Sequence, residues 1–173
     1  MASPPRGSSV PAGAGSSFDL GAWLAQLSGA PPIVQAGASV LRHRAQSVPS
    51  SLLATPALRE LVGLMTDVMR DAPGVGLAAP QIGVPLRVFV AEDQQERVSG
   101  LPEGTAKRKG RVALPLTVLV NPKLEPEGDE QVTFYEGCLS VRGYGALVPR
   151  WRAVRVSGVD TEGRPVALRL EGW

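Results

Sequence analysis

Apolar side chains recur at helical spacing over residues 57–71, which is the clearest periodic pattern in the chain. Intervals of three and four residues place these side chains on one side of a helix. They are Leu58, Leu61, Val62, Met65, Val68 and Met69. Thr55 is a suitable N-cap, Pro56 suits the first helical position, and Pro73-Gly74 ends the pattern. We therefore predict an amphipathic helix whose apolar side packs into a core.

The chain before this helix has little regular pattern. Residues 1–17 are rich in Ser, Pro and Gly and contain no acidic residue, which is typical of a flexible tail. A short helix is expected at 18–28, with Phe18, Trp23, Leu24 and Leu27 on its apolar side. Pro31-Pro32 then favours extended chain, and 33–41 is expected along the surface. We interpret residues 1–30 as a tail and 31–173 as one domain.

After the helix the pattern changes to short apolar runs rich in Val, which are typical of strands. Strands are predicted at 86–91, 116–120, 132–135 and 146–148. Residues 152–157 alternate, 160–164 resemble a turn, and 165–170 return, so this part predicts a hairpin. The charged segment 94–111 is interpreted as an exposed loop. One early helix followed by antiparallel strands indicates an α+β fold.

Composition and charge exclude several classes of protein. Apolar residues make up 43% of the chain and the mean hydropathy is +0.03, so a packed core is expected rather than disorder. No apolar run is long enough to span a bilayer. The basic run from Lys107 to Arg111 is interpreted as a solvated loop, because the net charge is only +2 and aromatic residues are 5%. No nucleic-acid or membrane partner is predicted.

The chain has one Cys and one His, which limits the chemistry that it can perform. They exclude an intrachain disulfide and a structural zinc site with four Cys or His ligands. Cys138 lies in the segment Glu136-Gly137-Cys138-Leu139-Ser140, and a lone Cys is most often a small buried apolar residue. His43 stands between Arg42 and Arg44, which is typical of a surface loop rather than of a general base for Cys138.

A second conspicuous segment is Gly-Val-Gly-Leu-Ala-Ala-Pro-Gln-Ile-Gly at 74–83. Glycines permit tight turns and close approach of another chain. The segment lacks the Lys-Ser/Thr ending of a phosphate loop. Taken alone, it predicts a tight turn between the helix and the strand at 86–91.

Together, the Gly-rich segment and the segment around Cys138 resemble the peptide deformylase family, and the resemblance extends over residues 31–173. It implies antiparallel sheets around a helix. It also implies hydrolysis of the formyl group from the N-formylmethionine of nascent polypeptides, close to the ribosome. Family members use iron(II), with zinc or nickel as substitutes, held by one Cys and by two His of a His-Glu-x-x-His helix. Water takes the fourth position, as in other catalytic sites.

The resemblance implies a role for five residues of this chain. Cys138 matches the thiolate ligand of the metal. Gln81 and the backbone N–H of Leu139 match the two donors to the oxyanion that develops during catalysis. Val75 and Gly76 match the backbone that pairs with the extended substrate peptide, a form of strand addition that tolerates many sequences.

The third motif of the family, His-Glu-x-x-His, is not in this sequence. In the family its helix begins a few residues after the position of Trp173, and Glu136 does not replace its glutamate. We therefore expect a C-terminally truncated deformylase or a fragment. The metal-binding helix would be missing, so the domain would be incomplete, would fold poorly, and would be inactive.

Two other functions remain open at this point. The chain could be a non-catalytic relative that binds formylated or nascent N-termini through the Val75–Gly76 edge without a metal. It could also be a hydrolase with Cys138 as nucleophile, although the sequence offers no suitable base. The expected location is the cytoplasm for a bacterial chain and the mitochondrion or plastid for a eukaryotic one.

Overall fold

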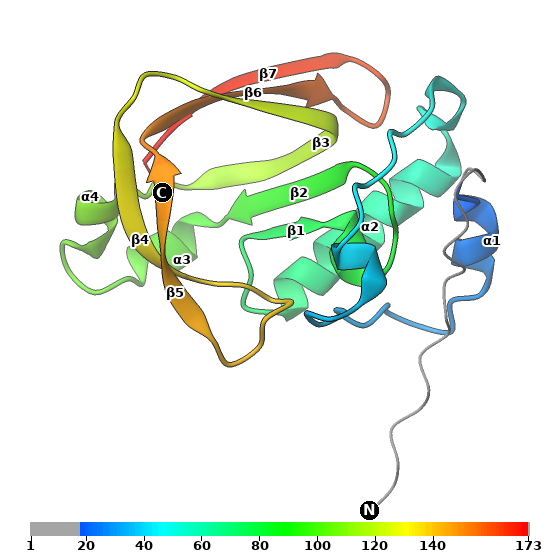
Figure 1. Ribbon diagram of the computed structural model, residues 1–173, viewed down its shortest axis with the longest axis horizontal. Helices are drawn as coiled ribbons and strands as arrows, with labels where there is room; N and C mark the ends of the chain where they lie inside the picture. Colours follow the sequence, from blue (N-terminus) through cyan, green and yellow to red (C-terminus); the bar gives the residue numbers. More distant parts are fainter. Residues whose placement is uncertain (1–17, 173) are drawn as a thin grey trace, which may run out of the picture.

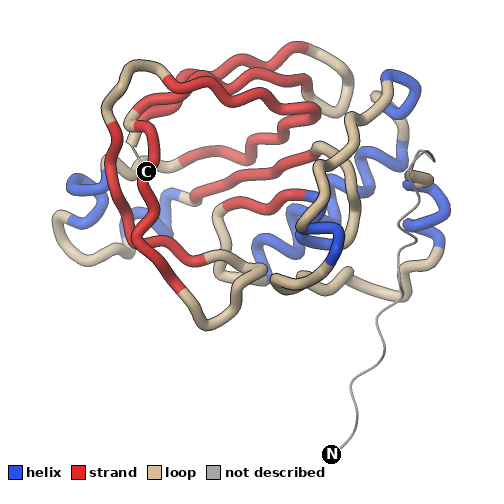
Figure 2. Tube along the Cα trace, in the orientation of Figure 1, coloured by secondary structure: helices blue, strands red, loops and turns tan. Residues whose placement is uncertain are grey.

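The computed structural model describes residues 18–172, so the predicted tail over 1–17 lies outside the described residues. The fold is α+β, as predicted, with a five-stranded antiparallel sheet in the order β1-β2-β3-β6-β7 and a two-stranded sheet β4-β5 (Figure 1). The strands are β1 Gly76–Ala78, β2 Val88–Asp93, β3 Leu114–Pro126, β4 Gln131–Gly137, β5 Gly145–Trp151, β6 Ala153–Val159 and β7 Pro165–Glu171. Figure 2 shows the β4–β5 pair standing beside the larger sheet.

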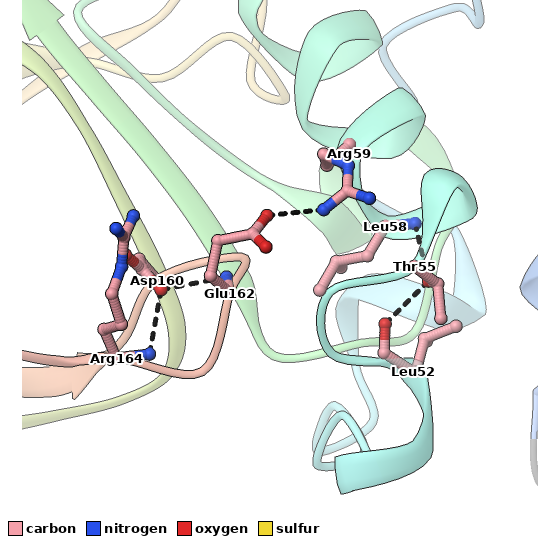
Figure 3. Close-up of polar contacts among 7 residues, drawn as sticks. All are labelled: Leu52, Thr55, Leu58, Arg59, Asp160, Glu162 and Arg164. Carbon is pink, nitrogen blue, oxygen red and sulfur yellow. Dashed lines mark hydrogen bonds and ion pairs between the residues drawn. The ribbon is translucent and has the colours of Figure 1, made fainter.

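The predicted helix is confirmed as α2, Pro56–Asp71. The Thr55 hydroxyl accepts a hydrogen bond from the backbone N–H of Leu58 at 3.3 Å and donates to the carbonyl of Leu52 at 2.7 Å (Figure 3). The apolar side of α2 is buried against the sheet; its fully covered members are Leu58, Leu61, Met65 and Met69. This side supplies a large part of the hydrophobic core.

The first helix is shorter than predicted. α1 spans Leu20–Ala25 rather than 18–28, and Asp19 caps it by accepting a hydrogen bond from the N–H of Ala22 at 2.9 Å. Leu20, which the apolar pattern did not single out, is 3% exposed and joins the core. The short helix therefore packs on the domain instead of standing apart from it.

β3 is much longer than the predicted strand at 116–120. Its first half pairs with β2 and its second half with β6, and the register shifts between Val120 and Lys123. Asn121 has a φ of 53° at this point, and its side chain bonds both the N–H and the carbonyl of Val48 at 2.8 and 2.9 Å. The bulge bends the strand, which is why a single period-2 pattern does not cover it.

The segment 94–111 is not a plain exposed loop. It holds two short helices, α3 Gln95–Ser99 and α4 Thr105–Lys109. The interpretation of the basic run as solvated is wrong for Arg111, whose side chain is only 10% exposed and is paired with Asp93. A buried carboxylate at the end of β2 holds this arginine, so the end of the segment is fixed to the sheet.

The hairpin at the end of the chain is confirmed as β6 and β7. In its turn, Asp160 Oδ1 accepts hydrogen bonds from the backbone N–H groups of Glu162 and Arg164, both at 2.9 Å (Figure 3). Glu162 also pairs with Arg59 of α2 at 2.5 Å, and the carbonyl of Thr161 accepts from Ala54 N–H at 2.7 Å. The turn is thereby tied to the start of α2.

Several large apolar side chains are exposed on the strands and loops of the described part of the chain. They are Val112, Leu116, Leu124, Tyr135, Val141, Tyr144, Leu147 and Trp151. The expectation that the chain folds poorly stays a prediction. No helix among residues 18–172 is long and apolar enough to cross a membrane.

Acid should weaken the contact between α2 and β2. Arg70 donates two hydrogen bonds to Glu92, at 2.7 and 2.8 Å, and these bonds lower the pKa of Glu92 below its ordinary value of 4.5. A carboxylate with a lowered pKa stabilises the fold above pH 4.5, and this contribution is lost as the pH falls further. We expect Glu92→Gln to flatten the dependence of stability on pH below about 4.5 in urea unfolding. An unchanged slope would contradict this expectation.

Candidate functional site

A cleft of about 1000 Å³ opens between the Gly-rich segment and the loop that follows β4. All five residues to which the sequence assigned a role line this cleft: Val75, Gly76, Gln81, Cys138 and Leu139. Residues separated by more than fifty positions therefore share one site. The loop after β4 reaches across the molecule toward the C-terminal end of α2 (Figure 1).

One wall of the cleft is a sheet edge. The Gly-rich segment is not only a turn, because Gly76–Ala78 forms β1 and Ala79–Ile82 forms a short 3-10 helix, η3. β1 pairs with β2 on one side only and is the outermost strand of its sheet. Val75 and Gly76 line the cleft beside this edge. Unpaired backbone groups at a sheet edge can accept an extended peptide.

Gln81 is held in one orientation by its own turn. Its Oε1 accepts a hydrogen bond from the N–H of Ala78 at 2.9 Å, so the amide nitrogen points the other way. That nitrogen, Nε2, donates to Ser140 Oγ at 3.2 Å and lies 3.9 Å from Cys138 Sγ. One amide hydrogen is thus engaged by the buried Ser140, and the sulfur of Cys138 lies within hydrogen-bond reach of the other.

Cys138 and Leu139 line the cleft side by side. The thiol of Cys138 is exposed, so the cysteine is not a buried apolar residue. Within residues 18–172, the backbone N–H of Leu139 donates no hydrogen bond. An exposed thiol, a backbone N–H with no partner among residues 18–172 and an oriented amide therefore belong to three residues that line one cleft. This donor arrangement suits the oxygen of a small carbonyl group.

A segment that the sequence placed merely at the surface also builds the site. Within 33–36, the N–H of Val34 donates to the carbonyl of Gln81 at 2.8 Å, and that of Ala36 donates to the carbonyl of Ser140 at 2.7 Å. The 33–36 segment thus connects the Gln81 turn to the loop after β4. Its irregular backbone bonds leave no periodic signal, and only the Pro-Pro pair before it indicated extended chain.

Glu136 has a structural role in the β4–β5 pair. It accepts two hydrogen bonds from Arg150 across the strands, at 3.0 and 2.7 Å. These bonds raise the pKa of Arg150. Glu136 is consequently occupied in this ion pair, and it does not line the cleft.

The residues of the cleft do not fit a catalytic metal ion. The described part of the chain holds no group of three or more His, Cys, Asp or Glu that could bind one. His43 bonds the carbonyl of Ser39 through Nδ1 at 2.8 Å and does not line the cleft. Catalytic metals of this type use three protein ligands, and Cys138 offers one. Because His43, the one His of the sequence, does not line the cleft, it is not placed to act as a base for Cys138, which argues against Cys138 as a nucleophile.

Gly74 is packed so closely against the side chain of Leu139 that a side chain at Gly74 would force Leu139 to shift. A Cβ at Gly74 would lie 2.7 Å from Leu139 Cδ1. We expect Gly74→Ala to displace Leu139 and lower the free energy of unfolding by about 1 kcal/mol. In the matched control, Gly63→Ala, the new Cβ of α2 meets nothing within 4 Å, and the helix should gain about 0.5–1 kcal/mol. Urea unfolding checks both; effects of the same sign would contradict the packing argument.

Comparisons with known proteins give a consistent result. Residues 30–173 match the sequence profile of the family described as polypeptide deformylase. The chain is 42% identical over 143 residues to the chloroplastic peptide deformylase 1A of Solanum lycopersicum, which covers 83% of this chain and 52% of the relative. It is 45% identical over 151 residues to peptide deformylase 1 of Streptomyces coelicolor, which covers 87% of this chain and 66% of the relative.

A solved structure shows the same fold. An actinonin-bound class I type b peptide deformylase from Acinetobacter baumannii matches with a TM-score of 0.70 at 27% identity, over 84% of this chain and 85% of that chain. By contrast, the chain spans between about half and two thirds of the length of the two curated relatives above.

Proposed function

Because this chain belongs to the polypeptide deformylase family, we propose that its cleft is the substrate site of a peptide deformylase. In that role it binds the N-formylmethionine end of a nascent polypeptide. The reaction assigned to the site is hydrolysis of the formyl amide. For the location we propose the cytoplasm in a bacterium and the plastid or mitochondrion in a eukaryote, since the relatives include a chloroplastic and a bacterial protein.

The observation that carries this proposal is the meeting of Gln81, Cys138 and Leu139 at the edge of β1. A peptide that adds to the free edge at Val75 and Gly76 would run extended along the cleft. Its formyl oxygen would then accept hydrogen bonds from Gln81 Nε2 and from the N–H of Leu139. A free amino terminus has no such oxygen, so these donors distinguish formylated from unformylated peptides.

The chemical part of the proposal follows from the ligand set. In the family, an iron(II), zinc or nickel ion supplies the activated water, and Cys138 is the proposed thiolate ligand. One thiolate without further ligands holds such an ion weakly. We propose that the 173-residue chain binds formylated peptides, does not retain a metal through purification, and does not hydrolyse these peptides unless metal is added.

The second candidate function, a binding protein without catalysis, is favoured by one observation. The described residues contain no cluster of three metal-ligating side chains. A chain whose biological task is binding needs none. Added iron(II) or nickel distinguishes the two functions: turnover of formyl-Met-Ala-Ser with added metal supports the hydrolase, whereas metal-independent binding without turnover supports the binding protein.

Calorimetric titration tests the proposed substrate. Formyl-Met-Ala-Ser, acetyl-Met-Ala-Ser and Met-Ala-Ser are titrated into the purified chain in the presence of EDTA. We expect the formylated peptide to bind at least about tenfold more tightly than the free amine, since each added hydrogen bond contributes about 0.5–1.5 kcal/mol. Equal affinities for the formylated and unformylated peptides would overturn the proposal.

A further inference from the structure

The side chain of Gln35 makes three hydrogen bonds, and two of them reach the loop after β4. Its Nε2 donates to the carbonyl of Leu139 at 3.1 Å and to that of Ile33 at 3.2 Å. Its Oε1 accepts from the backbone N–H of Arg142 at 3.2 Å. One exposed amide therefore bonds the loop on both sides of Ser140.

The backbone on either side of Gln35 bonds the two halves of the site. The N–H of Val34 donates to the carbonyl of Gln81 at 2.8 Å, and the N–H of Ala36 donates to the carbonyl of Ser140 at 2.7 Å. Gln35 thus sits in the middle of the 33–36 segment, between the turn that orients the amide and the loop that carries the thiol.

Few other bonds fix the loop from Cys138 to Arg142. Within it, the N–H of Val141 donates to the carbonyl of Cys138 at 2.9 Å, which closes a turn but does not place that turn on the domain. Placement comes from the bonds of Gln81 to Cys138 and Ser140, from the bonds of Ala36 and Gln35, and from the Leu139 side chain, which packs against the core. Ala36 and Gln35 both belong to the 33–36 segment.

We propose that Gln35 is a positioning residue, which holds the loop so that the N–H of Leu139 and the amide of Gln81 face one point. The planar peptide bond ties the Leu139 carbonyl to the N–H of Ser140, and the two soft dihedrals of Leu139 separate that carbonyl from its own N–H. Gln35 bonds the loop at both Leu139 and Arg142, so it limits the positions that the loop backbone, including the N–H of Leu139, can take. The formyl part of this inference rests on the proposed function; the placement of the loop does not.

Two substitutions distinguish the hydrogen bonds that the Gln35 side chain donates from the one that it accepts. Gln35→Met keeps the length of the side chain and removes all three bonds. Gln35→Glu keeps an acceptor for Arg142 and loses the donor to Leu139. Gln95→Met is the matched control, because this exposed glutamine of α3 bonds only Ser99, at 2.9 Å, and does not line the cleft.

Amide hydrogen exchange measured by NMR reads the placement of the loop directly. In Gln35→Met we expect exchange at Arg142 and Ala36 to become about tenfold faster, which is about 1.4 kcal/mol of lost protection. Exchange in β6 and β7 should not change. In Gln35→Glu, Arg142 should stay protected. Unchanged exchange at Arg142 in Gln35→Met would overturn the inference, as would equal acceleration in β6 and β7.

Peptide binding supplies the second measurement. Gln35→Met and Gln35→Glu should each lose about tenfold of the preference for formyl-Met-Ala-Ser over Met-Ala-Ser, which corresponds to about 1.4 kcal/mol. Binding of Met-Ala-Ser itself should not change, nor should Gln95→Met behave differently from the unmodified chain. A preference retained in both Gln35 variants would overturn the role in formyl recognition. If the unmodified chain shows no preference for the formylated peptide, the proposed function fails. Amide hydrogen exchange at Arg142 then still decides whether Gln35 holds the loop in place.

Discussion

Replacing Arg111 with Met is expected to lower the free energy of unfolding by about 3–5 kcal/mol, because it leaves the buried carboxylate of Asp93 without its partner. Arg111 donates to both oxygens of Asp93, at 2.6 and 2.9 Å. The two side chains are only 10% and 7% exposed. Removing one member of a buried ion pair is strongly destabilising, because the other charge then stays buried without a partner. Urea unfolding of Arg111→Met measures the loss.

Two further variants make this expectation specific. Arg59→Met removes an ion pair whose side chains are 49% and 37% exposed, and it should cost less than about 1 kcal/mol. Replacing both partners, Arg111→Met with Asp93→Leu, should recover part of the loss, because no buried charge then remains. Equal effects of Arg59→Met and Arg111→Met would show that burial of the pair does not matter.

Replacing Gln81 with Met should abolish most of the preference for a formylated peptide. The substitution removes the side-chain amide that lies 3.9 Å from Cys138 Sγ, and it leaves the N–H of Ala78 without its acceptor. Losing a donor to the formyl oxygen together with the support of the turn should cost about 1–3 kcal/mol. We expect a ten- to hundredfold weaker affinity for formyl-Met-Ala-Ser, measured by calorimetry with EDTA present.

The control for Gln81 must separate recognition from folding. Met-Ala-Ser should bind Gln81→Met and the unmodified chain with similar affinity, since edge pairing at Val75 and Gly76 does not use the amide. Gln81→Glu keeps the acceptor for Ala78 but removes the donor, so it should also lose formyl preference. A formyl preference that survives in both variants would remove Gln81 from the site.

The sequence predicted best where one physical pattern dominates. The helix over 57–71 is amphipathic, capped by Thr55 and begun by Pro56, so it differs from the observed α2 by one residue at its start. The terminal hairpin has alternating strands and a turn rich in polar residues, and it too is confirmed. In both, the local preference and the packing of the domain favour the same structure.

Elements that depend on distant contacts were not predictable. β3 continues past 120 because its second half pairs with β6, beyond a bulge at which Asn121 bonds Val48, and no local pattern reveals either contact. β1 has only three residues, too few for a period, and it forms through pairing with β2. The buried position of Arg111 depends on Asp93, which lies at the other end of a charged segment. These are tertiary interactions that override local preference.

The candidate site, too, could be predicted from the sequence only in part. The two motifs supplied five of the residues that line the cleft, but not the atoms that orient them. Ser140 lies in the second motif without an assigned role, and Gln35 lies in neither motif; they act through hydrogen bonds to Gln81 and to the loop after β4. The pairing of a Gly-rich segment with a distant cysteine is visible in sequence. The 33–36 segment that connects them is visible only in three dimensions.

NMR of the chain with a peptide labelled at the formyl carbon tests the central claim most directly. With formyl-Met-Ala-Ser in EDTA, we predict shifts at the backbone N–H of Leu139 and the side-chain amide of Gln81, and magnetisation transfer from the formyl proton to both. Met-Ala-Ser should shift Val75 and Gly76 but neither of those donors. Shifts confined to other surfaces, or identical shifts with both peptides, would contradict a formyl-recognising cleft at the edge of β1.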